Sequence, residues 1–149
     1  MYEINKQDNH DCLYSGHIVY SDKIPVFRDD CDNQLLETPY RLSIITVPAV
    51  NTTRALEKNV SMELIDSTIY QRIDNLFSIA VNHDVDILIL GAWGCGVFGG
   101  DFNKVGSFFV KQLCNKYDGF FKSVVFAMKH DNVNVNVIGK ILDYHFNKA

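Results

Sequence analysis

A glycine-rich stretch in the second half of the chain holds the residues best suited to chemistry. It directly follows four aliphatic residues, Ile87–Leu90, and reads Gly91-Ala92-Trp93-Gly94-Cys95-Gly96-Val97-Phe98-Gly99-Gly100-Asp101. Glycine tolerates positive φ angles and lets the backbone approach a ligand closely. Successive backbone N–H groups at the start of a helix favour binding of a phosphate group. The pattern therefore predicts a diphosphate site made by the backbone N–H groups of Gly94, Cys95, Gly96, Val97 and Phe98.

Two other kinds of chemistry fit parts of this stretch less well. Cys95 lies in a sharp turn before a helix, where a thiol nucleophile is conceivable, but no histidine or acid is placed by the sequence to activate it. The spacing of Gly94, Gly96 and Gly99 also matches a dinucleotide-binding fingerprint. That motif normally opens the first βαβ unit, with an acidic residue ending the next strand. Here it opens the second unit, and Asp118 precedes the next strand, so a classical dehydrogenase is disfavoured.

Strands and helices alternate around this loop. Apolar runs predict strands, and a 3.6-residue apolar period with capping residues predicts helices. Two βαβ units in succession would give a parallel sheet with helices on both faces, as one α/β domain over residues 1–149. The predicted strands are Arg41–Val47, Ile87–Leu90 (buried on both faces) and Ser123–Met128; the predicted helices are Met62–Val81 after Ser61, Phe102–Lys116 after Asp101 and Val133–Phe146.

The first fifty residues are predicted to form a small hairpin and a loop. Two short strands, His17–Tyr20 and Pro25–Arg28, flank a turn at residues 21–23, and residues 29–33 read as a solvated turn. Residues 48–51 follow the strand Arg41–Val47, at the edge where open α/β sheets bind ligands. Asn51 is therefore a candidate ligand contact, although an Asx turn explains the residue slightly better.

The glycine-rich string closely resembles the diphosphate-binding loop of the poly(ADP-ribose) glycohydrolases, which are macrodomain-fold proteins. The segments Tyr14-Ser15, Pro25–Asp29 and Pro48–Asn51 extend the resemblance to the microbial type of that family. The resemblance implies a three-layer α/β/α fold with a mostly parallel sheet. It also implies that Phe98 packs on the distal ribose of ADP-ribose and that Met128 lies near the adenine.

The catalytic signature of that family is absent. Its members carry a triple-glycine loop followed by adjacent glutamates, and this sequence contains neither. The resemblance therefore implies a C-terminal portion, truncated on the N-terminal side, that binds ADP-ribose without the hydrolytic part. Because a shortened sheet leaves an apolar edge bare, a homodimer or a partner chain is expected to cover it.

Composition excludes several other functions. The net charge is −4 and no basic run is present, which argues against direct binding of nucleic acid. No signal segment or long apolar window is found, so a cytoplasmic protein without membrane contact is expected. The four cysteines show no metal-binding spacing, so no metal site or cofactor is predicted.

Three functions remain open at this stage. The first is binding of ADP-ribose, ADP-ribosylated protein or a related NAD-derived nucleotide without hydrolysis. The second is a glycohydrolase whose acid comes from a missing segment or another chain, because glycosidic cleavage needs a carboxyl group to protonate the leaving oxygen. The third is a partner-binding scaffold with a vestigial loop.

Overall fold

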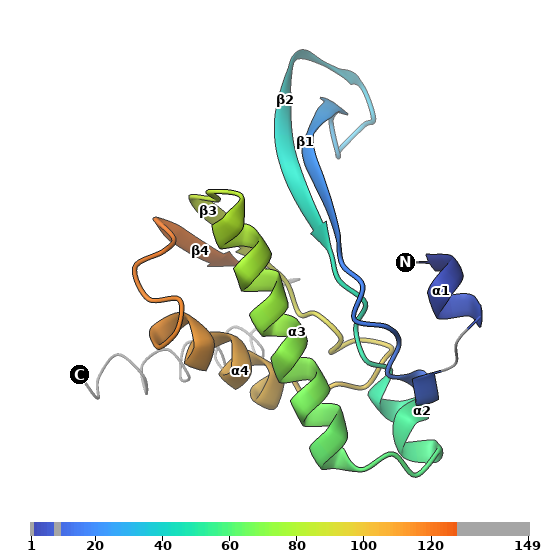
Figure 1. Cartoon of the computed structure of the whole chain (residues 1–149). Coiled ribbons are helices and arrows are strands. Elements are labelled where there is room, and N and C mark those ends of the chain that lie inside the picture. Colours follow the sequence, from blue (N-terminus) through green and yellow to red (C-terminus); the bar gives the residue numbers. More distant parts are fainter. Residues whose placement is uncertain (1, 8–9, 128–149) are drawn as a thin grey trace.

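The computed structural model describes residues 2–7 and 10–127 of the chain. Helices and strands are mixed in an α/β arrangement, as predicted, and the strands form two small sheets. Figure 1 shows a long hairpin standing away from a body of two packed helices and a two-stranded sheet. In chain order the elements are α1 (Tyr2–Gln7), the 3₁₀ turn η1 (His10–Cys12), β1 (Val19–Arg28), β2 (Leu35–Thr46), α2 (Thr52–Glu57), α3 (Met62–Asn82), β3 (Ile87–Leu90), α4 (Phe102–Cys114) and β4 (Ser123–Phe126).

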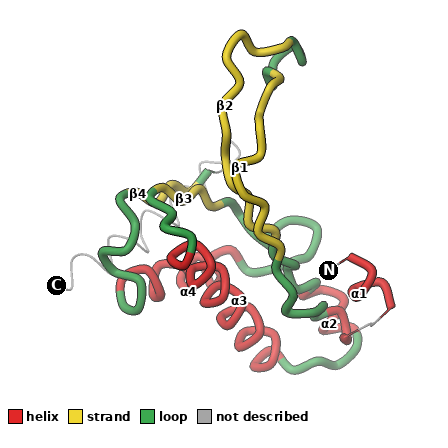
Figure 2. The backbone as a smooth tube through the Cα atoms, turned by 45° about the horizontal axis from the view of Figure 1, so that its top comes forward, coloured by secondary structure: helices red, strands yellow, loops and turns green. Residues whose placement is uncertain are grey.

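The hairpin is longer than the sequence predicts. β1 and β2 pair antiparallel from Val19–Thr46 to Arg28–Leu35, so the turn lies at residues 29–34. The predicted turn at residues 21–23 is wrong: the register shifts there, and Lys23 has a φ of +49° within a continuous strand. Turn-forming residues can also make a bulge, which explains the error. Figure 2 shows the hairpin extending well beyond the helices.

Only one of the two predicted βαβ units is formed among the described residues. β3 and β4 are parallel neighbours, paired from Ile87–Ser123 to Leu90–Phe126, with α4 between them in sequence. The strand β2, in contrast, pairs only with β1, in a separate antiparallel sheet. The prediction of a mostly parallel sheet is therefore wrong. A residue pattern identifies a strand, but the strand's neighbour depends on contacts that are distant in sequence.

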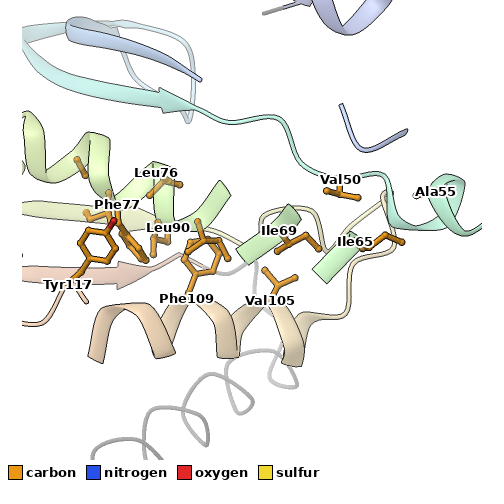
Figure 3. Packing of buried hydrophobic residues seen from close by; sticks show 13 residues of the cluster. Val50, Ala55, Ile65, Ile69, Leu76, Phe77, Leu90, Val105, Phe109 and Tyr117 are labelled. Atoms are coloured by element: carbon orange, nitrogen blue, oxygen red, sulfur yellow. The ribbon is translucent and has the colours of Figure 1, made fainter. Parts of the chain in front are cut away.

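The core lies between α3, α4 and the β3–β4 sheet, as Figure 3 shows. Ser61 caps α3, since its side chain accepts a hydrogen bond from the Leu64 N–H. The apolar face predicted for this helix is confirmed. Rings from several elements meet around Phe77, which lies 5.1 Å from Tyr117 and 5.9 Å from Phe109 between ring centroids. The buried apolar residues of the α3 face are Ile65, Ile69, Ile73, Leu76, Phe77 and Ala80.

β3 is buried on one face only, which corrects the expectation that both faces are covered. Leu88 and Leu90 face the core and are buried, whereas Ile87 and Ile89 are 61% and 70% exposed. The strand thus alternates as a half-buried strand does, despite its uniformly aliphatic sequence. No described helix is long and apolar enough to cross a membrane. The predicted helix Val133–Phe146 and the candidate residue Met128 lie outside the described residues.

Candidate functional site

The glycine-rich loop leads from β3 to the start of α4 and is folded back on itself. Gly94 and Gly99 adopt φ angles of +76° and +69°, the left-handed region that glycine occupies at low cost. The Gly100 N–H donates to the Gly94 carbonyl at 3.0 Å, and the Gly99 N–H donates to the Gly96 carbonyl at 3.0 Å. These two bonds close the loop over residues 94–100. The side chain of Asp101 then caps α4 by accepting from the N–H groups of Asn103 and Lys104.

Four of the five N–H groups predicted to hold a diphosphate are available. Those of Gly94, Gly96, Val97 and Phe98 make no hydrogen bond to any described residue. The fifth, from Cys95, donates to the Ala92 carbonyl at 3.1 Å. Unpaired successive N–H groups before a helix can bind an anion without a basic side chain.

The loop is tied to the start of α2. The Thr53 N–H donates to the Phe98 carbonyl at 3.2 Å. A Cβ atom built on Gly99 would lie 2.2 Å from the Thr53 Oγ1, so a larger residue cannot take this place without displacing α2. Gly96 differs, because a Cβ there would meet nothing within 4 Å. Gly99 therefore serves close packing, whereas Gly96 faces open space.

Asn51 lies next to this contact and caps α2. Its side-chain oxygen accepts from the Arg54 N–H at 3.2 Å, and its own N–H donates to the Cys12 carbonyl. The cap accounts for the residue's position. A ligand contact by Asn51 stays a prediction, as do the contacts predicted for the loop and for Met128.

A buried arginine joins the segments that surround the loop. Arg72 on α3 is 4% exposed, and its guanidinium donates to the Pro48 carbonyl at 2.9 Å and to the Tyr14 carbonyl at 2.6 Å. The Tyr14 ring lies beside the Phe98 ring, with centroids 6.0 Å apart. Phe98 is half-buried and is not part of the hydrophobic core. Through Tyr14, the arginine therefore helps to place the aromatic ring predicted to contact a ribose.

Charged residues usually lie on the solvent face of an amphipathic helix, but Arg72 is buried. Arg72 follows Ile69 by three positions, so it shares the buried side of α3. That spacing was the available signal. The need for a charged group there could not be read from the sequence, because its partners come from two distant loops.

The surroundings of Trp93 and Cys95 indicate that both residues serve packing. The Trp93 ring N–H donates to the Val47 carbonyl at 3.1 Å, and its ring packs edge-on against Phe109 at 6.4 Å. Burial, and to a lesser degree the nearby Asp101 carboxylate, raises the pKa of the Cys95 thiol to about 11. A thiol that stays protonated at neutral pH is a poor nucleophile, so Cys95 is not suited to nucleophilic chemistry.

The loop forms an open rim rather than a deep pocket. Beneath it lies a void of only about 10 Å³, lined by apolar residues such as Phe102, Val105 and Phe109. Within residues 2–7 and 10–127, no cluster of three metal-ligating side chains occurs. The arrangement can therefore offer backbone N–H groups and an aromatic ring to an anionic ligand. The loop itself carries no glutamate that could act as a general acid. Glu37, Glu57 and Glu63 lie in β2, α2 and α3, and Glu57 forms an ion pair with Arg54.

Comparison with solved structures places this fold among known proteins. The chain is similar to poly(ADP-ribose) glycohydrolase from Deinococcus radiodurans in complex with ADP-ribose, with 32% identity and a TM-score of 0.83 over 99% of the chain. It is also similar to poly(ADP-ribose) glycohydrolase from Thermomonospora curvata, with 36% identity and a TM-score of 0.82 over 94% of the chain. No known family profile matches the sequence, and no curated protein matches it.

The fold and these similarities define an α/β protein of the macrodomain-like class found in poly(ADP-ribose) glycohydrolases. Within that class, the solved structures that this chain resembles are microbial poly(ADP-ribose) glycohydrolases, and the similarity extends over 94–99% of the chain. It spans 58% of the length of the Deinococcus protein and 52% of the Thermomonospora protein. This partial coverage agrees with the expected correspondence to a C-terminal portion.

Proposed function

We propose that the chain binds ADP-ribose or a related NAD-derived nucleotide through the loop at residues 94–98, and does not hydrolyse it alone. The observation that carries this proposal is the set of unpaired N–H groups at Gly94, Gly96, Val97 and Phe98, held in place by the Gly99 and Gly100 bonds. The two phosphates can accept hydrogen bonds from these N–H groups without any basic side chain nearby. This mode of binding suits a chain whose net charge is −4. The ADP-ribose bound by the Deinococcus relative supports the choice of ligand.

The roles of individual residues follow from this geometry. The diphosphate accepts hydrogen bonds from the loop N–H groups, and the ring of Phe98, supported by Tyr14, packs against the distal ribose. The thiol of Cys95 stays protonated and takes no part. The proposal includes ADP-ribose groups attached to proteins, and a cytoplasmic location is expected from the sequence.

Calorimetric titration of the purified chain with ADP-ribose tests the proposal. We expect saturable binding to the wild-type chain and none to Gly96→Glu, because a carboxylate there repels the diphosphate. The neutral variant Gly96→Gln is the matched control, since it has the same size and lacks the charge. A Cβ at this position meets no atom within 4 Å, so neither variant disturbs the packing. A folded wild-type chain that releases no heat with ADP-ribose would refute the proposal.

A second candidate is a glycohydrolase completed by an additional segment. The relatives are named as glycohydrolases, which favours this activity for the complete protein. The general acid would have to come from outside the described residues, because glycosidic cleavage needs a carboxyl group aimed at the leaving oxygen. Release of ADP-ribose from a poly(ADP-ribose) substrate by the chain together with a polypeptide that supplies the unmatched part of the relatives, but not by the chain alone, would support this candidate.

A further inference from the structure

Tyr14 adopts a backbone conformation that is unfavourable for its residue type. Its φ angle is +61°, in the left-handed region that a bulky side chain rarely occupies. Among the described residues with a positive φ angle, Tyr14 is the only aromatic one. Backbone strain of this kind persists only where the surroundings enforce it, and it is concentrated at functional sites. The strain therefore indicates a role for the Tyr14 side chain.

Two hydrogen bonds hold the peptide group that follows Tyr14. The buried guanidinium of Arg72, on α3, donates to the Tyr14 carbonyl at 2.6 Å. The Ser15 N–H donates to the side-chain oxygen of Asn5, on α1, at 2.8 Å. The Tyr14 carbonyl and the Ser15 N–H belong to one peptide group, so α3 and α1 together fix its orientation. These two bonds keep Tyr14 in its strained conformation.

The ring that is held in this way lies at the nucleotide site proposed above. Its centroid is 6.0 Å from the centroid of the Phe98 ring, and the two ring planes are 31° apart. Both rings are half-buried, and neither belongs to the hydrophobic core. The Phe98 N–H is one of the loop N–H groups that make no hydrogen bond to a described residue. Tyr14 and Phe98 thus form adjoining aromatic surfaces beside an anion site.

An aromatic surface beside an anion site is suited to a nucleotide. Backbone N–H groups bind the phosphates, and aromatic rings offer a large apolar face to the sugar or base attached to them. The sugar next to the diphosphate is the part of ADP-ribose that such a surface reaches first.

We propose that Tyr14 is a ligand-contacting residue of the nucleotide site, and that its ring binds the sugar next to the diphosphate together with the ring of Phe98. Arg72 and Asn5 are positioning residues that keep the Tyr14 ring in place despite the strain. This inference rests on the proposed function, because it names a further contact at the same site. It gives Tyr14 a role beyond support of the Phe98 ring.

Calorimetric titration of Tyr14 variants with ADP-ribose tests the proposal. We expect Tyr14→Phe to bind within about twofold of the wild type and Tyr14→Leu to bind roughly tenfold more weakly, because only leucine loses the aromatic contact. If the wild-type chain does not bind ADP-ribose, the proposed function fails and this inference fails with it. If the wild type binds and Tyr14→Leu binds equally well, only this inference is wrong.

Two smaller residues separate the ligand contact from stability. Tyr14→Gly and Tyr14→Ala both lack the ring, but only glycine adopts a φ angle of +61° without strain. We expect Tyr14→Gly to unfold at a higher urea concentration than Tyr14→Ala, while both bind ADP-ribose as weakly as Tyr14→Leu. Affinity that increased with stability across these variants would reduce Tyr14 to a structural residue and overturn the proposal.

A double-mutant cycle tests the role of Asn5. The variant Asn5→Leu removes the oxygen that accepts from the Ser15 N–H. We expect it to weaken ADP-ribose binding several-fold in the wild-type background and to have no effect in the Tyr14→Gly background, where no strained ring remains to be held. Equal losses in both backgrounds would show that Asn5 does not act through Tyr14.

Nuclear magnetic resonance of the ADP-ribose complex tests the contact itself. The ring signals of Tyr14 are identified by their absence from the spectrum of Tyr14→Phe. We expect nuclear Overhauser effects between the Tyr14 ring protons and the sugar protons. Effects that involve the Phe98 ring but not the Tyr14 ring would limit Tyr14 to supporting Phe98, and the proposal would be wrong.

Discussion

The guanidinium of Arg72 donates to the carbonyl of Tyr14 across 58 positions of sequence, at 2.6 Å. The same group donates to the Pro48 carbonyl, so one side chain of α3 holds two loops that border the glycine-rich loop. Since the Tyr14 ring lies beside Phe98, this bond links the helical core to the predicted ligand site.

Replacing Arg72 by methionine should destabilise the fold. The two carbonyl groups would lose their donors while remaining partly buried, which costs about 1–3 kcal/mol. Urea unfolding followed by circular dichroism measures the free energy of unfolding. Gln71→Met on the neighbouring exposed position is the control, with an expected change within about 0.5 kcal/mol. Equal stability of the two variants would show that the arginine does not hold these loops.

The variant Gly99→Ala should distort the loop, whereas Gly96→Ala should not. At Gly99 the new methyl would meet the Thr53 Oγ1 at 2.2 Å, and the φ of +69° strains any other residue. We expect a loss of about 1–3 kcal/mol in stability and weaker ADP-ribose binding. Adding Thr53→Ala should recover part of the stability, because it removes the atom in closest contact. Thermal unfolding and calorimetry of the single and double variants check both effects.

The Cys95 thiol should react slowly and only at high pH. Its pKa in the folded state is raised to about 11 from the ordinary value of 9.0, chiefly by burial. Between pH 9 and about 11, the Cys95 thiol therefore keeps its proton in the folded state and loses it in the unfolded state. The stabilisation is complete below pH 9 and is lost as the pH rises toward 11. Iodoacetamide labelling of Cys95, compared with the exposed Cys31, checks the reactivity.

A charge variant separates the two causes of this shift. Asp101→Asn keeps a side-chain oxygen to cap α4 and removes the carboxylate that raises the Cys95 pKa. The labelling profile of Cys95 should move to lower pH while remaining above the ordinary range, since burial is the larger cause. A profile that does not move would contradict the contribution of Asp101.

Asn51→Ala tests whether a capping residue also contacts the ligand. Loss of the cap on α2 should cost about 1 kcal/mol, as should Ser61→Ala at the start of α3. We expect only Asn51→Ala to weaken ADP-ribose binding in addition, because the α2 start touches the loop through Thr53. Equal affinities for the two variants would limit Asn51 to its cap.

The sequence by itself determined the local features of this protein. A 3.6-residue apolar period and capping residues located α3 and α4, because an amphipathic helix is specified by near neighbours and its cap. The glycine-rich string located the loop, since the positive φ angles at Gly94 and Gly99 are a property of single residues. These inferences need no knowledge of distant contacts.

Only the tertiary structure decided which elements meet. β2 pairs with β1 rather than joining β3, and Ile89 faces outward although its sequence suits a buried strand. Arg72 is buried because carbonyl groups of two remote loops receive its hydrogen bonds. Pairing of strands and burial of charge depend on groups that are far apart in sequence. A local residue pattern does not identify those groups.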